Sequence, residues 1–230
     1  MKRNEYPRPR FRRGNWINLN GQWHFAFDDG NIGLTNKWYT GSVDFPLRIN
    51  VPFVYESPLS GINNQDRHDT VWYKREFTCP HIDDTEIVLL HFGAADYHTQ
   101  VFINGHMAAE HHGGETPFSA NITPYLSGIS DNNSQILTVR IADRLDDETL
   151  PRGKQFWQTK SDGIWYTRST GIWQTVWIEI VHKKHIDSAD FQCDIDRGYV
   201  EMEVVSESAR AGDNLRYTVR KKIFSSPKAF

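Results

Sequence analysis

The chain has 230 residues, enough for one large domain or for one domain and part of a second. Its 26 Lys and Arg residues nearly balance 29 Asp and Glu residues, so no strong field exists to recruit nucleic acid or an anionic membrane surface. Two cysteines cannot form a disulfide framework, and neither a signal peptide nor a run of about 18 apolar residues is visible, so we expect a cytoplasmic protein without membrane or nucleic-acid partners.

Short segments rich in β-branched and aromatic residues follow one another along the chain, and helical periodicity is almost absent. Residues 98–111 predict a hairpin, because Asn104-Gly105 favours a type I′ turn, which needs a positive φ at both central positions. The other strands expected in this part of the chain lie at residues 21–30, 71–78, 86–93, 135–143 and 171–181. Many short strands without intervening helices predict an all-β antiparallel sandwich or jelly roll.

Residues 144–170 are poor in strand pattern but rich in aromatic side chains, which argues against disorder. We expect an ordered, exposed loop across one face or one end of the sandwich. Trp173 and Trp177 follow it at a spacing that puts both on one face of a strand, where packing explains them best. Trp157 and Trp165 lie within the loop, and the sequence leaves packing and ligand binding open for them.

The strand pattern restarts after residue 182. Three alternating segments, 185–196, 198–208 and 214–224, predict strands. A complete immunoglobulin-type sandwich needs about seven strands and roughly 100 residues, more than this part of the chain supplies. We therefore predict two domains, a sandwich over residues 1–182 and a partial immunoglobulin-like sandwich over residues 183–230, which is either truncated or covered at its open edge by another chain.

Several motifs occur in a characteristic order: "YPRPRFRRGNWINLNGQWHFAFDD", "INVPFVYESPLSGI", "VWYKREF", "VFINGHMAAEHHGGETPFSANITPYL" and "STGIWQTVWIEI". In this order they resemble the N-terminal region of family 2 glycoside hydrolases, the group of β-galactosidases, β-glucuronidases and β-mannosidases, over about residues 6–182. The resemblance implies a jelly-roll sugar-binding domain in residues 1–182, followed by the beginning of the family's immunoglobulin-like domain. It also implies that a full-length enzyme hydrolyses terminal β-glycosides, such as β-galactosides, with retention, using two glutamates of a barrel that this chain lacks.

No catalytic residue is therefore expected here, and the expected partners are a carbohydrate and the missing catalytic barrel or other subunits. In the family, two loops of the jelly roll lend side chains to the rim of the sugar pocket. The positions to which the resemblance and the loop aromatics point are Asp162, Trp165 and Trp157 before the "GIW" strand, and Asn64, His68 and Asp69 before the "WY" strand. A rim carboxylate would accept hydrogen bonds from sugar hydroxyls, while an aromatic ring stacks on the C–H face of the sugar.

Neither a cofactor nor a metal ion is expected. His111 and His112, and likewise His182 and His185, are one or three positions apart, and such neighbours point to opposite faces of an extended segment.

Two other functions stay open: a free-standing lectin-like module that uses the loop aromatics, and a structural or interaction domain without sugar affinity. The strands expected after residue 183 favour the glycosidase, since a self-sufficient lectin has no need of them. Formation of a homo-oligomer also stays open.

Overall fold

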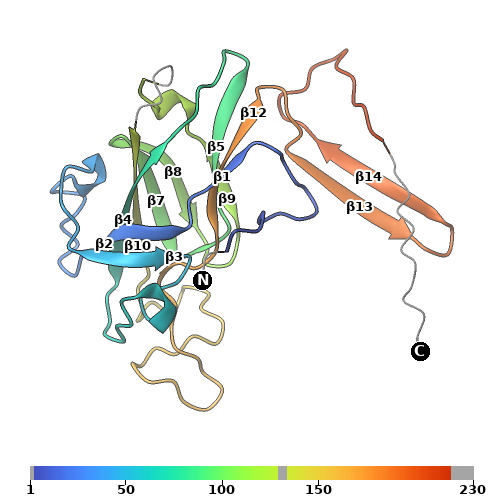
Figure 1. Cartoon of the computed structure of the whole chain (residues 1–230). Helices are drawn as coiled ribbons and strands as arrows, with labels where there is room; N and C mark the ends of the chain where they lie inside the picture. Colours follow the sequence, from blue (N-terminus) through green and yellow to red (C-terminus); the bar gives the residue numbers. More distant parts are fainter. Residues whose placement is uncertain (1–2, 129–133, 219–230) are drawn as a thin grey trace, which may run out of the picture. The chain divides into compact units, whose positions relative to one another are not determined.

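The structure is a computed structural model that describes residues 3–128 and 134–218 (Figure 1). The chain divides into two compact units, Met1–Lys183 and Lys184–Phe230. In the described ranges, helical structure is limited to 3-10 turns at η1 (Trp38–Thr40), η2 (Pro58–Ser60) and η3 (Thr123–Tyr125). No helix in the described part of the chain is long and apolar enough to cross a membrane.

Two antiparallel sheets build the first unit. The larger sheet has the strand order β3-β2-β4-β10-β7-β8 and the smaller sheet β1-β12-β5-β9, while β11 pairs with β6. The strand bounds are β1 (Trp16–Asn18), β2 (Gly21–Phe27), β3 (Leu47–Val51), β4 (Thr70–Thr78), β5 (Glu86–Phe92), β6 (Ala95–Asp96), β7 (His98–Ile103), β8 (His106–His112), β9 (Phe118–Asn121), β10 (Ser134–Ala142), β11 (Gly171–Ile172) and β12 (Val176–His182). Strands far apart in sequence, such as β1 and β12, are neighbours, as in a jelly roll. The predicted all-β sandwich is confirmed.

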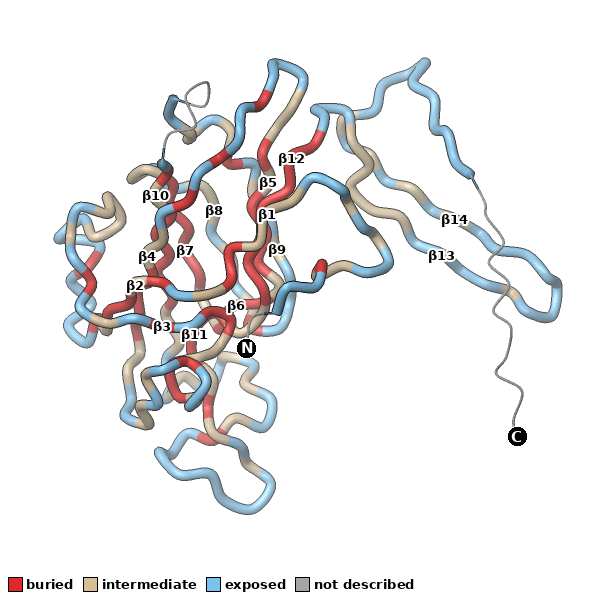
Figure 2. Tube along the Cα trace, viewed as in Figure 1, coloured by how far each residue is buried: buried red, intermediate tan, exposed pale blue. Residues whose placement is uncertain are grey.

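The hydrophobic core fills the space between the two sheets. Alternate side chains of each strand point inward, among them Phe25, Tyr73 and Val139 from the larger sheet and Leu90 and Ile178 from the smaller. Figure 2 shows buried residues concentrated along the strands of this unit and exposed residues in its loops. The alternation fixes the register, because a slip by one residue would carry the inward set to solvent.

The structure confirms the expected hairpin but divides the expected last strand of the first unit in two. Asn104 and Gly105 both have positive φ, 49° and 83°, and join β7 to β8, which confirms the hairpin. The strand expected over residues 171–181 is instead split into β11 and β12. The backbone N–H groups of Trp173 and Gln174 both donate to the carbonyl of Ala94, at 3.3 Å each, so two residues face one partner as in a β-bulge. The composition did not reveal this interruption, since β-branched and aromatic residues stand on both sides of it.

The N-terminal arm covers the outer face of the smaller sheet. Glu179 of β12 is completely buried there and accepts hydrogen bonds from the Tyr6 hydroxyl at 2.5 Å and from the Trp177 indole at 2.9 Å. Its carboxylate also pairs with the guanidinium groups of Arg8 at 2.6 Å and Arg13 at 2.7 Å. Two basic residues of the arm, Arg8 and Arg13, thus form ion pairs within their own unit. Trp177 has the packing role expected for it.

The second unit contains an antiparallel hairpin of β13 (Ser188–Asp194) and β14 (Tyr199–Val205). A third strand was expected over residues 214–224. Its described part, residues 214–218, is not in a strand, and residues 219–224 lie outside the described residues. Large apolar side chains of the unit are exposed, including Phe191, Ile195, Tyr199, Val200, Leu215 and Tyr217.

Candidate functional site

Two long connections meet at one end of the first unit. One comprises residues 52–69, between β3 and β4, and the other residues 143–170, between β10 and β11. In Figure 1 the second connection forms the yellow loops below the sheets, and the short helix of the first lies at the same end. We call the surface made by these two connections the loop face. All six residues to which the sequence pointed belong to it.

Arg168 fastens the two connections together. Its guanidinium group donates to the backbone carbonyls of Gln65, at 2.8 Å, and Asp66. Its Nε lies 3.7 Å from the carboxylate of Glu56, and both side chains are only 2% exposed. The Glu56 carboxylate also accepts the backbone N–H of Thr170 at 3.2 Å. The buried contact between Arg168 and Glu56, together with three backbone groups, therefore holds the loop face in one arrangement.

Two buried carboxyl groups, Glu56 and Asp96, and the half-buried carboxyl group of Asp143 lie in or behind this surface. Burial raises the pKa of Glu56 to about 8, although Arg168 acts against the shift. Burial, followed by the negative charge of Asp143, raises the pKa of Asp96 to about 7. Burial also raises the pKa of Asp143, whose carboxylate accepts the Thr170 hydroxyl at 2.7 Å. A carboxyl group with a pKa near 7 is partly protonated at neutral pH, so it can donate as well as accept hydrogen bonds. Groups with such shifted pKa values cluster at functional sites.

A cavity of about 220 Å³ opens beside Asp96. The Asp96 carboxylate accepts Nε2–H of Gln155 at 2.6 Å, and Oε1 of Gln155 accepts the backbone N–H of Ser169 at 2.7 Å. Gly114 lines the cavity, and a Cβ there would lie 2.2 Å from Oδ1 of Asp96, so this close approach requires glycine. The Trp173 indole lines it too and donates to the Gly114 carbonyl at 2.7 Å. The cavity is smaller than the roughly 300 Å³ of a complete small-molecule pocket, so it supplies part of a site.

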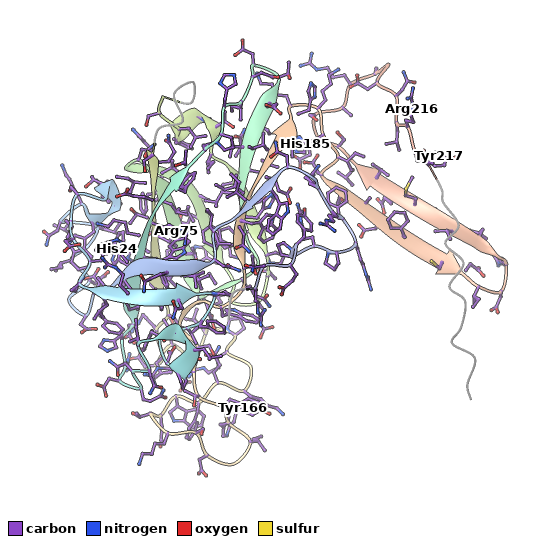
Figure 3. All side chains as sticks on the ribbon, viewed as in Figure 1. His24, Arg75, Tyr166, His185, Arg216 and Tyr217 are labelled. Carbon is purple, nitrogen blue, oxygen red and sulfur yellow. The ribbon has the colours of Figure 1, made fainter. Side chains whose placement is uncertain are left out.

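Phe156, Trp157 and Trp165 form an aromatic cluster in the second connection. The Phe156 ring is 4.7 Å from that of Trp157 and 6.4 Å from that of Trp165, and the two indoles are 5.4 Å apart, centroid to centroid. Phe156 donates its N–H to the Tyr166 carbonyl, and Tyr166 donates to that of Lys154, at 2.8 Å each. Trp157 is 47% and Tyr166 65% exposed, and Figure 3 shows Tyr166 among the loops of this end. The expected exposed loop across one end of the sandwich is confirmed.

Asp162 lies exposed at the turn of this loop, where its carbonyl accepts the N–H of Trp165 at 3.0 Å. An open hollow of about 530 Å³ is lined by Asp162, Trp165 and Tyr166, together with Ser161, Gly163 and Thr167. The structure thus brings a carboxylate and an indole to one hollow, which is the pair of groups that a sugar subsite uses.

Asn64, His68 and Asp69 form a separate group in the first connection. The His68 ring lies 2.7 Å from an Asp29 carboxylate oxygen through Nδ1 and 3.1 Å from the Asn64 amide nitrogen through Nε2. The Asp69 carboxylate accepts two hydrogen bonds from Arg67, at 2.7 and 2.6 Å. These contacts shape the loop itself. Their contribution to a ligand site stays a prediction, as it does for Asp162, Trp165 and Trp157.

Sequence reasoning missed the polar residues that build this region, the buried Glu56, Asp96 and Arg168 and the half-buried Asp143 and Gln155. Asp96 follows two alanines, and Asp143 comes directly after an apolar strand, which are weak signals of burial. Arg168 donates hydrogen bonds to residues more than a hundred positions away, and no local sequence pattern predicts such a contact.

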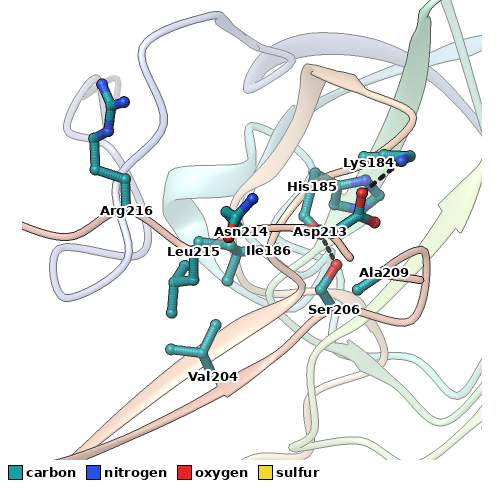
Figure 4. Close-up of a pocket in the computed structure, with 10 residues that line it drawn as sticks. All are labelled: Lys184, His185, Ile186, Val204, Ser206, Ala209, Asp213, Asn214, Leu215 and Arg216. Carbon is teal, nitrogen blue, oxygen red and sulfur yellow. Dashed lines mark hydrogen bonds and ion pairs between the residues drawn. The ribbon is translucent and has the colours of Figure 1, made fainter. Parts of the chain in front are cut away.

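The second unit holds a cavity of about 540 Å³ (Figure 4). An ion pair of Lys184 with Asp213 at 2.7 Å and a hydrogen bond from the Ser206 hydroxyl to the His185 carbonyl at 2.6 Å cross-link its lining. The described lining residues include no Phe, Tyr or Trp on which a sugar ring could stack. The loop face is therefore the better candidate for a sugar site.

Comparison with known proteins agrees with the sequence motifs. The family model for the sugar binding domain of glycosyl hydrolases family 2 matches residues 17–176. A β-glucuronidase of Felis catus is 34% identical over 154 residues, a match that covers 61% of this chain and 23% of that protein. A β-glucuronidase of Paenibacillus borealis is 30% identical over 136 residues, covering 59% of this chain and 22% of the relative. The chain thus spans less than a quarter of the length of these curated relatives.

A solved structure shares the fold. The β-glucuronidase from Ruminococcus gnavus in complex with D-glucaro 1,5-lactone superposes with a TM-score of 0.66 over 88% of this chain and 35% of the other chain. The sequence identity of that match is 22%, so it shows the fold alone. The family model, by contrast, covers more than half of the chain. This chain therefore belongs to glycosyl hydrolase family 2 and contains the sugar-binding domain of that family.

Proposed function

We propose that this chain is the non-catalytic N-terminal portion of a retaining family 2 glycosidase, and that its loop face forms part of the rim of the sugar pocket. The observation that carries the proposal is the incomplete site on a family 2 sugar-binding domain. The cavity beside Asp96 is about 220 Å³, and the hollow at Asp162 is open to solvent. Groups suited to sugar hydroxyls and sugar rings are present, but nothing encloses a ligand as a complete pocket does.

The glycoside that we propose is a β-glucuronide. The relatives reported above are β-glucuronidases. We therefore favour a β-glucuronide over the β-galactoside that the sequence analysis gave as an example. Retaining hydrolysis needs two carboxyl groups about 5 Å apart, one as nucleophile and one as acid and base. We place both in a catalytic barrel outside this chain. The buried carboxyl groups here would then orient loops and accept hydrogen bonds from the substrate.

The second unit fits the same proposal. Phe191 and Val200 are exposed on the same face of its hairpin and are of the kind that the facing sheet of a sandwich would bury. We interpret the unit as the beginning of the immunoglobulin-like domain that follows the jelly roll in this family.

A free-standing lectin-like module is the second candidate. The observation that favours it is the exposure of Trp157 and Tyr166 beside the hollow at Asp162, because an exposed aromatic ring can stack on a sugar without help from another domain. Such a module would bind a monosaccharide or disaccharide in isolation.

Two assays of the purified chain separate these functions. The first measures release of p-nitrophenol from the β-D-glucuronide, β-D-galactoside and β-D-mannoside. The second is calorimetric titration with glucuronate, galactose, mannose and a β-linked disaccharide, on the unaltered chain and on Trp165→Ala. A variant at an exposed residue of the second unit, Tyr199→Ala, serves as the matched control for loss of an aromatic ring.

Absence of turnover and of binding tighter than millimolar is the expected result, because the pocket would be completed only by the barrel. Turnover by rigorously pure chain would contradict the placement of the catalytic carboxylates elsewhere. Clear binding that Trp165→Ala abolishes and Tyr199→Ala preserves would establish the lectin-like module instead.

A further inference from the structure

The hairpin of β7 and β8 brings three ligand-type side chains together on the outer face of the larger sheet. His98 lies directly opposite His112, and Gln100 lies opposite Glu110. Because side chains alternate along a strand, these four residues share one face, while Val101 and its neighbours of the other face enter the core. In Figure 1 the two strands run side by side, and β8 is the edge strand of its sheet. The side chains of His98 and Glu110 are 26% and 46% exposed there, so solvent reaches both of them.

The side chains of His98, Glu110 and His112 converge. Their candidate ligand atoms all lie within 4.8 Å of one another, and this is the one group of three or more such side chains in the described part of the chain. The two imidazole rings are stacked with centroids 4.1 Å apart and planes inclined by 8°. Nε2 of His98 lies 2.8 Å from Oε1 of Glu110. Histidines that are neighbours along the chain do not converge, but the hairpin creates a pair across strands that sequence spacing does not reveal.

A buried network orients the carboxylate of this group. Gln100 is 9% exposed and donates its amide to Oε1 of Glu110 at 3.0 Å. The amide oxygen of Gln100 accepts a hydrogen bond from buried Arg140 at 3.1 Å, and Arg140 also donates to Asn31 at 2.8 Å. Metal-binding carboxylates commonly have such outer partners, and these partners fix their direction.

We propose that His98, Glu110 and His112 bind a divalent transition metal ion of the zinc type. Two imidazole nitrogens and one carboxylate oxygen form a donor set that suits Zn²⁺, whereas Mg²⁺ and Ca²⁺ prefer oxygen ligands alone. Ligand atoms of a tetrahedral Zn²⁺ site are about 3.3 Å apart, given Zn–N and Zn–O distances near 2.0 Å. Because the lone pair of each ligand nitrogen lies in the plane of its ring, one of the two stacked imidazole rings must turn out of the stack before both can bind the same ion. The ion replaces the hydrogen bond between His98 and Glu110, and a water molecule takes the fourth position.

The test is calorimetric titration of the whole chain with ZnCl₂, in a buffer that does not chelate metal and without a polyhistidine tag. His98→Ala and His112→Ala each remove one ligand, and Gln100→Leu removes the outer partner of Glu110. His111→Ala is the matched control, because His111 lies between two of the ligands in sequence but contacts Phe118, with ring centroids 4.3 Å apart, and Thr116 at 3.1 Å. Circular dichroism and thermal unfolding establish that each variant is folded.

We expect one Zn²⁺ ion per chain with micromolar or tighter affinity. His98→Ala and His112→Ala should each weaken binding by tenfold or more, Gln100→Leu by about tenfold, and His111→Ala by less than twofold. Nuclear magnetic resonance of the unaltered chain gives an independent measurement, in which the imidazole signals of His98 and His112 shift with Zn²⁺ and that of His111 does not. Affinity no tighter than millimolar, or equal affinity of His98→Ala, His112→Ala and the unaltered chain, would overturn the proposal and leave the three residues as a surface hydrogen-bonded cluster.

Discussion

The buried carboxyl groups in two regions of the first unit have different surroundings. On the outer face of the smaller sheet, burial would raise the pKa of Glu179, but hydrogen bonds, first of all from His91 and Tyr6, outweigh burial and hold this pKa well below its ordinary value. On the loop face, burial raises the pKa of Glu56 to about 8 and that of Asp96 to about 7. The same type of side chain is a fixed anion in one region and a nearly neutral acid in the other.

The difference follows from the number of cations and donors that each carboxyl group meets. Glu179 pairs with two guanidinium groups, Arg8 and Arg13, whereas Glu56 has one at 3.7 Å and Asp96 accepts a hydrogen bond from the amide of Gln155. At Glu179 the surrounding cations and hydrogen-bond donors compensate the buried negative charge fully, which stabilises the fold and fixes the N-terminal arm on the smaller sheet. Partial compensation leaves an uncharged or easily neutralised group, which costs stability at neutral pH and is typical of a binding or catalytic region. The comparison therefore separates a structural centre from a candidate site within one unit.

The largest expected effect is on the structural centre. Glu179→Gln removes the charge that compensates Arg8 and Arg13 and should lower the free energy of unfolding by about 4 kcal/mol, as when one partner of a buried ion pair is lost. Urea unfolding followed by tryptophan fluorescence measures the change. Glu76→Gln is the matched control at an exposed position of β4 and should change the free energy by less than about 0.5 kcal/mol. A loss below 1 kcal/mol for Glu179→Gln would contradict the structural role.

The opposite pKa shifts predict opposite pH dependences. The pKa of Asp96 is raised when folded, so its contribution to stability is complete below its ordinary pKa near 4 and is lost as pH rises through about 7. The Glu179 contribution, with a lowered pKa, is present above its ordinary value and is lost in acid. Asp96→Asn should therefore reduce the fall in unfolding free energy between pH 4 and pH 8 by about 4 kcal/mol, since the pKa is raised by about three units and one unit corresponds to about 1.4 kcal/mol.

Urea unfolding at several pH values measures this slope. Asp162→Asn, at an exposed position of the loop face, is the matched control and should leave the slope unchanged. Glu56 has a raised pKa as well, so a smaller fall should persist in Asp96→Asn up to about pH 8. An unchanged slope in Asp96→Asn would show that Asp96 is ionised in the folded chain at neutral pH.

Arg168 should have an intermediate effect. Arg168→Met removes hydrogen bonds to the carbonyls of Gln65 and Asp66, and we expect a loss of about 2 kcal/mol. The loss is smaller than for Glu179 because Glu56, with a pKa of about 8, can remain buried in its neutral form. Hydrogen exchange should become faster in residues 52–69 and 143–170 and stay unchanged in the strands. The exposed Arg144→Met, in the same connection, is the control, and equal exchange in both variants would exclude a clamp at Arg168.

The fold could be predicted from the sequence much further than the candidate site. Strand periodicity and the Asn104-Gly105 turn are local signals, and the structure has the hairpin and most of the strands that these signals indicate, although residues 214–218 are not in a strand. The bulge at Trp173 and Gln174 was missed because it depends on the carbonyl of Ala94, about eighty positions away. The clamp of Arg168 and the cross-strand pair of His98 and His112 depend likewise on which strands become neighbours. Local patterns specify elements, whereas the polar contacts that build sites come from their assembly.

The smallest effect separates the two interpretations of the loop tryptophans. Trp157 is 47% exposed and packs at the edge of Phe156, so Trp157→Ala should lower the free energy of unfolding by about 1 kcal/mol or less. A fully buried tryptophan would cost about 3 kcal/mol or more, and Trp23→Ala, in the core, provides that reference. Urea unfolding of both variants measures the difference. A loss as large as that of Trp23→Ala would assign Trp157 to packing, whereas a small loss leaves its ring face for a sugar, as the proposed function requires.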